Sequence, residues 1–67
     1  MDTLSQQMLA LEKQFFRTAG AKDEAIKALG LTPMRYYQLL NRLLDDPAAL
    51  AAEPQLVYRL RRIAHRT

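Results

Sequence analysis

The 67-residue sequence contains no cysteine, which excludes disulfide bonds, thiolate metal sites and nucleophilic thiols. Its single histidine, His65, cannot form a zinc site without carboxylate ligands. A glycine-rich phosphate loop and a Ser-His-acid set are also missing, and the pair Asp45-Asp46 before Pro47 is typical of a helix start. These absences predict a protein that is not an enzyme and that has no cofactor and no metal site.

Long apolar runs are absent as well. No apolar stretch approaches the length of a membrane span, and the acidic Asp2 lies where a secretion signal carries basic residues. Without a signal and without cysteine, the sequence predicts a cytoplasmic protein that does not associate with a membrane. Hydrophobic residues make up 49% of the chain, which is enough for the core of one small domain over residues 1–67.

Glycine and proline are few, at two and three residues, whereas helix-forming residues are abundant. No segment alternates polar and apolar residues over the length of a strand. The sequence therefore predicts an all-α domain, a compact bundle of four to five short helices that contains a helix-turn-helix. The predicted helices span residues 3–18, 21–29, 33–44, 47–52 and 54–65.

The predicted boundaries rest on short local signals. Ala19-Gly20 is expected to end the first helix and Gly30 the second, since glycine readily takes the positive φ found after helices. Thr32-Pro33, Asp46-Pro47 and Glu53-Pro54 are typical of helix starts, where proline loses no hydrogen bond. Within the second helix, we expect the acidic pair 23–24 in the first turn, near the positive end of the helix dipole.

Apolar residues recur at helical spacing in the first and last predicted helices. In the first helix, the residues expected in the core are Leu4, Met8, Leu9, Leu11, Phe15 and Phe16. In the last helix, the expected buried residues are Leu56, Val57, Leu60, Ile63 and Ala64. Both aromatic residues of the first helix are thus interpreted as core residues rather than as a platform for stacking bases.

The segment from Lys22 to Leu43 fits a helix-turn-helix, with Gly30 as the glycine of the turn. Apolar residues stand where two crossed helices must touch, four residues before the glycine and six and nine residues after it. They are Ile26, Tyr36 and Leu39. Many such motifs place alanine four residues before the glycine, so the order of Ala25 and Ile26 departs from the common pattern.

The outward side of the helix 33–44 is the predicted DNA-reading surface, because the second helix of such motifs enters the major groove. Gln38 and Asn41 suit adenine, Arg35 suits guanine or a phosphate, and Met34 or Tyr37 suits a thymine methyl group. Lys22, Lys27 and Arg42 are expected to hold phosphates. The full predicted DNA-binding set is Thr32, Met34, Arg35, Tyr37, Gln38, Asn41, Arg42, Arg61 and Arg62.

The positive charge is concentrated at the carboxyl end. Residues 1–57 carry six basic and seven acidic side chains, whereas residues 58–67 carry four arginines and no acid. These arginines are Arg59, Arg61, Arg62 and Arg66. Cations also favour the carboxyl end of a helix dipole, but four in eight residues exceed that need. This asymmetry predicts an anionic partner that is met by the last helix.

Two strings, RYYQLLN at residues 35–41 and PQLVYRLRR at residues 54–62, resemble the hallmark strings of a small uncharacterised family of actinobacteria and their phages. The resemblance covers nearly the whole chain, although members often carry two tryptophans where this chain has Phe15-Phe16. It implies a helix-turn-helix fold and a bacterial or phage cytoplasm, and it implies no particular activity.

The favoured function is that of a small transcriptional regulator that binds double-stranded DNA sequence-specifically. Homodimerisation through the first or last helix is an additional expectation, because isolated domains of this size commonly pair to reach useful affinity. The alternative is a protein-binding module that docks its basic helix on the transcription machinery or on another acidic partner.

Overall fold

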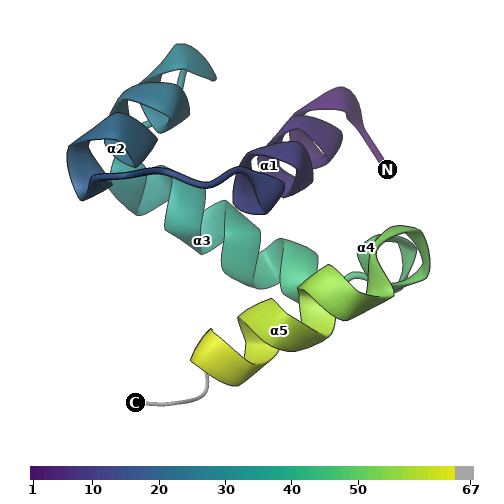
Figure 1. Cartoon of the computed structure of the whole chain (residues 1–67). Coiled ribbons are helices and arrows are strands. Elements are labelled where there is room, and N and C mark those ends of the chain that lie inside the picture. The colour runs from purple at the N-terminus through teal and green to yellow at the C-terminus, as the bar shows by residue number, and fades with distance from the viewer. Residues whose placement is uncertain (65–67) are drawn as a thin grey trace.

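The computed structural model describes residues 1–64 and contains five α-helices and, within that range, no strand. The helices are α1 (Thr3–Lys13), α2 (Ala19–Ala28), α3 (Pro33–Leu44), α4 (Pro47–Ala52) and α5 (Pro54–Ala64) (Figure 1). The predicted all-α bundle is therefore confirmed. The bounds predicted for α3 and α4 agree with the structure, and His65, predicted to end the last helix, lies outside the described residues.

Side chains cap the amino termini of the first four helices. Oxygen atoms of Asp2, Thr18, Thr32 and Asp46 accept hydrogen bonds from backbone amides two or three residues later, at 2.7 to 3.2 Å. In α3 and α4 a proline follows the cap directly. These caps satisfy amides that have no partner within the helix, and they explain why the short helices begin where they do.

The connection between α1 and α2 differs from the prediction. The backbone becomes extended at Gln14, so α1 ends at Lys13 rather than near residue 18. Ala19 and Gly20 do not end α1 but form the first turn of α2, because the Thr18 hydroxyl caps that helix through the amide of Ala21. The acidic pair 23–24 consequently lies in the second turn of α2 and not in the first.

This early end of α1 also changes the fate of the two phenylalanines. Phe15 was predicted to be in the core, yet 88% of its surface is exposed, whereas Phe16 is half-buried and packs against the core. Because the chain leaves the helix at Gln14, Phe15 no longer continues the apolar stripe of Met8 and Leu11.

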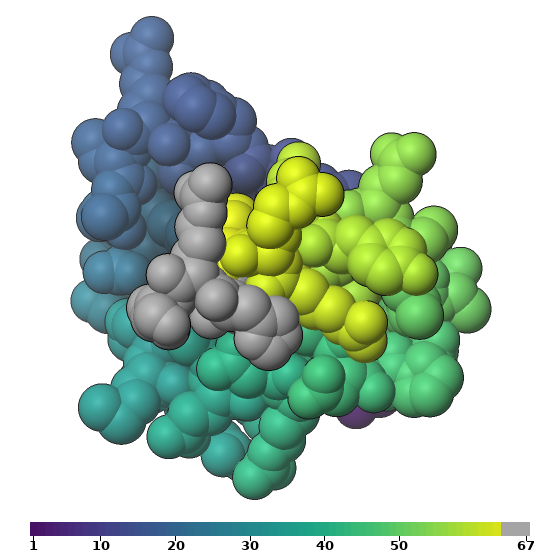
Figure 2. Space-filling view, turned by 90° about the horizontal axis from the view of Figure 1, so that it is seen from below, coloured from purple at the N-terminus to yellow at the C-terminus, as the bar shows by residue number. Residues whose placement is uncertain are grey.

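The core lies on the inner side of α3, which packs against α2, α4 and α5. Figure 2 shows the surface of the molecule from below, with α5 across the centre and right of the view and α3 along the lower edge. The fully buried hydrophobic residues are Met8, Leu9, Leu11, Ile26, Tyr36, Leu40, Leu43, Leu44, Ala49, Leu56 and Val57. All three segments that pack on α3 contribute to this cluster, so α3 is held on several sides.

The carboxyl-terminal part of α5 departs from the prediction in one respect. Ile63 was expected in the buried stripe, but 59% of its surface is exposed. Leu56 and Val57 fill the space against α3 and α4 one turn or more earlier, and the helix extends beyond this contact. The predicted burial of Ala64 concerns a side chain outside the described set. In the described part of the chain, none of the helices has the length and apolar character needed to cross a membrane.

Candidate nucleic-acid interface

One side of α3 carries no core residue and is open to solvent. We call it the outer face of α3, and its residues are Met34, Arg35, Gln38, Asn41 and Arg42. All five are exposed, with Met34 at 74%, while Tyr36, Leu40 and Leu43 on the opposite side are buried. The separation follows from the period of 3.6 residues, which brings residues three and four apart onto one side. Five of the predicted DNA-binding residues thus lie together.

The turn before α3 determines how this face is presented. Gly30 has φ of +84°, and its amide donates to the carbonyl of Lys27 at 2.9 Å. Only glycine takes this conformation without strain, although a Cβ atom at this position would meet no neighbour. Thr32 then caps α3 by accepting from the amide of Arg35 at 3.2 Å. Thr32, a predicted site residue, is exposed, and its hydroxyl already serves as the cap of α3.

The outer face of α3 combines amides and cations. Arg35 donates from Nη1 to Oε1 of Gln38 at 3.5 Å, a long contact within the face. Within residues 1–64, neither Arg35 nor Arg42 forms an ion pair. The face therefore presents hydrogen-bond donors and acceptors from two amides together with two positive charges.

Tyr37 lies at the border of this face rather than within it. Its surface is 43% exposed, and its ring packs edge-on against Tyr36 with centroids 5.1 Å apart. The ammonium of Lys22 lies 5.5 Å from the centroid of the Tyr37 ring, which is within the range of a cation–π interaction. Part of the ring is thus already occupied by contacts inside the protein.

Two hollows flank α3. A hollow of about 430 Å³ separates Tyr37 and Asn41 from Leu60 and Ile63 of α5. On the other flank, Arg42 lines a smaller hollow together with Asp2 and with residues 4, 5 and 8 of α1. The outer face is thus bordered by α5 on the Asn41 side and by the amino-terminal half of α1 on the Arg42 side.

The two predicted phosphate contacts on α5 have different surroundings. Arg61 is half-buried, and its Nε and Nη2 donate to the carbonyl of Leu44 at 2.9 and 2.6 Å. Arg62 is exposed and forms no ion pair with any described residue. Arg61 thus caps the carboxyl terminus of α3, whose last carbonyls have no partner within the helix. Arg66, the last arginine of the predicted basic end, lies outside the described residues.

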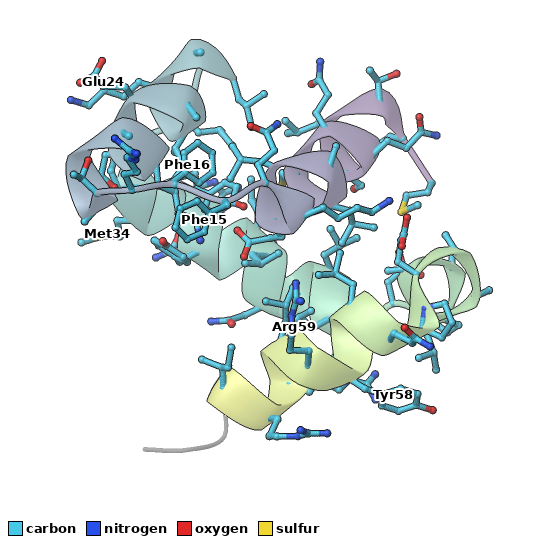
Figure 3. All side chains as sticks on the ribbon, viewed as in Figure 1. Phe15, Phe16, Glu24, Met34, Tyr58 and Arg59 are labelled. Carbon is cyan, nitrogen blue, oxygen red and sulfur yellow. The ribbon has the colours of Figure 1, made fainter. Side chains whose placement is uncertain are left out.

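Tyr58 and Arg59 are also exposed on α5. Figure 3 shows Tyr58 and Arg59 leaving α5 on different sides, and Met34 at the amino-terminal end of α3. Arg59 lies beside a shallow depression with Lys13 and Glu53, whose ammonium and carboxylate form an ion pair. The cations of α5 are therefore distributed around the helix rather than gathered on one side.

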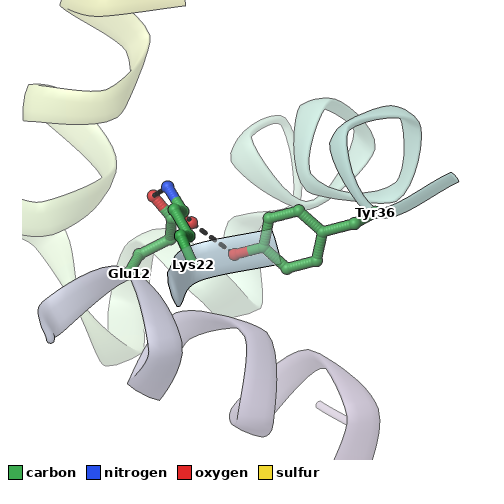
Figure 4. Close-up of polar contacts among 3 residues, drawn as sticks. All are labelled: Glu12, Lys22 and Tyr36. Carbon is green, nitrogen blue, oxygen red and sulfur yellow. Dashed lines mark hydrogen bonds and ion pairs between the residues drawn. The ribbon is translucent and has the colours of Figure 1, made fainter. Parts of the chain in front are cut away.

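Sequence analysis missed a partly buried polar cluster behind α3. The carboxylate of Glu12 at the end of α1 pairs with Nζ of Lys22 in α2, with 3.1 Å between Nζ and Oε2, and accepts a hydrogen bond from the hydroxyl of Tyr36 in α3 (Figure 4). Only 5% of the Glu12 side chain is exposed. Lys22, expected to hold a phosphate, is therefore engaged inside the protein. The only sequence signal was one glutamate beside the apolar stripe of α1.

Burial and charge affect the protonation of this cluster. Burial of the Tyr36 hydroxyl, together with its hydrogen bond to Glu12, raises the pKa of Tyr36 far above its ordinary value of 10.0. Burial opposes the charge on Lys22, but the hydrogen bond and negative charge of Glu12 outweigh it and raise the pKa of the ammonium above 10.5. Tyr36 therefore remains a neutral donor, and Lys22 a charged one, at neutral pH.

Comparison with known proteins gives one match. The model of a family described as a protein of unknown function (DUF3263) matches residues 1–67. A search of curated proteins and a search of solved structures each found no match.

Proposed function

This chain belongs to the DUF3263 family, and we propose that it is a small transcriptional regulator that binds double-stranded DNA sequence-specifically. In this proposal α2, the turn at Gly30 and α3 act as a helix-turn-helix, and α3 enters the major groove. One observation carries the proposal. The outer face of α3 presents two exposed amides and two arginines that form no ion pair within residues 1–64, on a helix whose opposite side is buried in the core. We place the protein in a bacterial or phage cytoplasm, as the family resemblance implies.

Base reading is assigned to the middle of the outer face. Gln38 and Asn41 each carry a carboxamide whose NH2 group can donate to N7 of adenine and whose oxygen can accept from the N6 amino group. They lie three residues apart on the same side of α3, so they can meet neighbouring base pairs. Met34, at the exposed amino-terminal end, suits the methyl group of thymine. Arg35 donates to Gln38 within the protein, and in the complex its remaining donors are assigned to a guanine or a phosphate.

Phosphate contacts are assigned to exposed cations near this face. Arg42 lies at one border of the outer face, and Arg62 lies on α5, which forms the other border. Because phosphate contacts position a protein without reading sequence, these two residues are expected to support binding to any duplex. Arg61 contributes less directly, since its guanidinium already binds the Leu44 carbonyl.

The test compares specific and non-specific binding in the same variants. A preferred duplex is first selected from a random pool, and fluorescence anisotropy then measures its affinity and that of a scrambled duplex at two salt concentrations. We expect Gln38→Ala and Asn41→Ala each to reduce the preference by about 1–3 kcal/mol, because each removes a base contact. Arg62→Ala should weaken both duplexes alike and lower the salt dependence.

Gln55→Ala is the matched control, because Gln55 is an exposed amide at the start of α5 and lines a depression to which no residue of α3 contributes. It should leave both affinities unchanged. If no duplex binds the wild-type protein at low salt, the proposed function is wrong. If the amide variants and Arg62→Ala weaken the two duplexes by the same factor, the division of roles is wrong although DNA binding stands.

A second candidate function is docking on an acidic protein surface. One observation favours it: Tyr58, Arg59 and Arg62 are exposed on α5, and this helix carries no acidic residue. Tyrosine and arginine are enriched among the residues that dominate binding energy in protein interfaces. Under this alternative, Tyr58→Ala should abolish binding of an acidic partner, whereas under the DNA proposal the same change leaves DNA preference intact.

A further inference from the structure

We infer that Glu12 is a positioning residue for DNA recognition, which fixes how α3 is turned and thereby decides which side chains of its outer face meet the bases. The inference rests on the proposed function and adds to it a residue on a helix that lies behind α3. Its basis is a single carboxylate bound by two other helices, through Lys22 of α2 and Tyr36 of α3 (Figure 4).

The Tyr36 contact acts on the rotation of α3. Tyr36 lies on the buried side, opposite the outer face, and its hydroxyl is at the far end of a long, rigid side chain. Side chains of a helix reach about 5–6 Å from its axis, so a rotation of about 20° moves their ends by about 2 Å. Such a movement is enough to break a hydrogen bond to a base edge, since these bonds tolerate only a few tenths of an ångström.

The Lys22 contact acts on the border of the same face. The Lys22 ammonium binds both oxygens of Glu12, at 3.3 and 3.1 Å, and lies 5.5 Å from the centroid of the Tyr37 ring. The same carboxylate therefore holds Tyr37 in place through Lys22 and holds Tyr36 directly. Two neighbouring residues of α3, one buried and one at the border of the outer face, thus depend on Glu12.

Apolar packing alone does not fix this rotation as sharply. Leucine side chains on the inner side of α3 can slide and repack with small changes in energy, whereas a buried carboxylate that loses a donor leaves an unsatisfied charge. Only 5% of the Glu12 side chain is exposed, at the wall of the hollow that it lines together with Lys22, so the carboxylate depends mainly on its protein donors. The polar cluster therefore favours one arrangement of α1, α2 and α3 over its close neighbours.

The experiment compares Glu12→Gln with Glu24→Gln in the full chain. Both variants remove one negative charge, but Glu24 is exposed and its one ion pair among the described residues is with Lys27 one turn away, so it is a matched control. Affinity is measured for the preferred duplex, for duplexes with single base-pair changes, and for a scrambled duplex. We expect Glu12→Gln to lower the ratio of preferred to scrambled binding about tenfold or more. Its effect on scrambled DNA should equal that of Glu24→Gln.

Tyr36→Phe is the second variant, because it keeps the buried ring and removes only the hydroxyl. It should lower the same ratio and change the ranking of the single base-pair variants in the same way as Glu12→Gln. In the double variant, the second change should add less than it does alone, since both changes act on the hydrogen bond between Glu12 and Tyr36. Equal losses for preferred and scrambled DNA, or an unchanged ratio in both variants, would overturn the inference.

A measurement without DNA separates this inference from the proposed function. Amide chemical shifts of the free protein should change along α3, at Met34, Gln38 and Asn41, in Glu12→Gln and not in Glu24→Gln. If the wild-type protein binds no duplex but these shifts change, the proposed function fails while the positioning of α3 by Glu12 stands. If duplex preference exists and neither the shifts nor the ratio changes, the proposed function stands and the inference is overturned.

Discussion

The helices α3 and α5 have nearly the same length and the same start signal, yet their polar residues do different things. Each begins at a proline and buries an aliphatic side. On α3, the one side-chain hydrogen bond of the outer face within residues 1–64 joins Arg35 to Gln38 in the same helix. On α5, Arg61 turns inward to the last turn of α3, while Arg62 next to it stays exposed.

In this comparison, side chains of other helices hold α3 in place, and Arg61 of α5 is one of them. Three polar contacts join α3 to other helices. Tyr36 of α3 binds Glu12 of α1, and Lys22 of α2 lies over the ring of Tyr37. Arg61 of α5 binds the last turn of α3. A helix that reads bases needs such fixed placement, because rigid elements hold side chains in the geometry that recognition requires. The comparison therefore agrees with the roles proposed for α3 and α5.

The largest expected effect on the free energy of unfolding comes from truncating one aliphatic residue on each of the two helices, which tests how tightly each helix packs. Leu40→Ala in α3 should lower the free energy of unfolding by about 2–5 kcal/mol, because Leu40 is buried and a cavity remains. Ile63→Ala in α5 should change it by about 0.5 kcal/mol or less, because Ile63 is mostly exposed. Urea denaturation followed by circular dichroism measures both. Similar losses would mean that the end of α5 packs as tightly as α3.

The two neighbouring arginines sharpen the comparison within α5. Arg61→Ala should lower the free energy of unfolding by about 1–3 kcal/mol, because it leaves the Leu44 carbonyl without its charged donor. Arg62→Ala should leave stability within about 0.5 kcal/mol of the wild type, and it serves as the matched control because the charge removed is the same. If the two variants lose equal stability, Arg61 is not a cap for α3.

How far the sequence predicts the fold depends on whether the signals are local. The start of α3 and of α4 follows from a capping residue before proline, and these signals act within three residues. The end of α1 does not follow from a local signal, since residues 14–17 contain neither glycine nor proline and Phe15 continues the apolar spacing. The competing local signal was Thr18, which caps α2 and so moves the boundary.

The candidate site shows the same limit. Helical spacing alone predicts which residues form the outer face of α3, because the buried side leaves only one side free. Spacing does not reveal that Arg61 turns toward a carbonyl 17 residues earlier or that Glu12 meets Tyr36 24 residues later. These contacts join elements that are distant in the sequence, so they depend on how the helices pack rather than on local pattern.

The smallest expected effect is a loss of folding stability at alkaline pH, which tests the contacts that Tyr36 and Lys22 make with Glu12. The pKa of Tyr36 is raised in the folded state, so its contribution to stability is complete below the unfolded value of 10.0 and is lost as the pH rises above it. The loss is at most about 1.4 kcal/mol over the first pH unit. The Lys22 ammonium, whose pKa is also raised by Glu12, adds a loss in the same direction above 10.5. Arg61 anchors α3 through a separate contact, to the Leu44 carbonyl, which the Arg61→Ala variant tests.

The measurement is urea denaturation from about pH 8 to about pH 11 for the wild type, Tyr36→Phe and Tyr58→Phe. Tyr36→Phe should be less stable at pH 8 and should lose less stability than the wild type on going to pH 11, since it has no hydroxyl to ionise. Tyr58→Phe, which changes an exposed ring on α5, should follow the wild type. If all three lose stability in parallel, the Tyr36 hydroxyl does not anchor α3, and the contrast between the two helices must then rest on Arg61 and Lys22 alone.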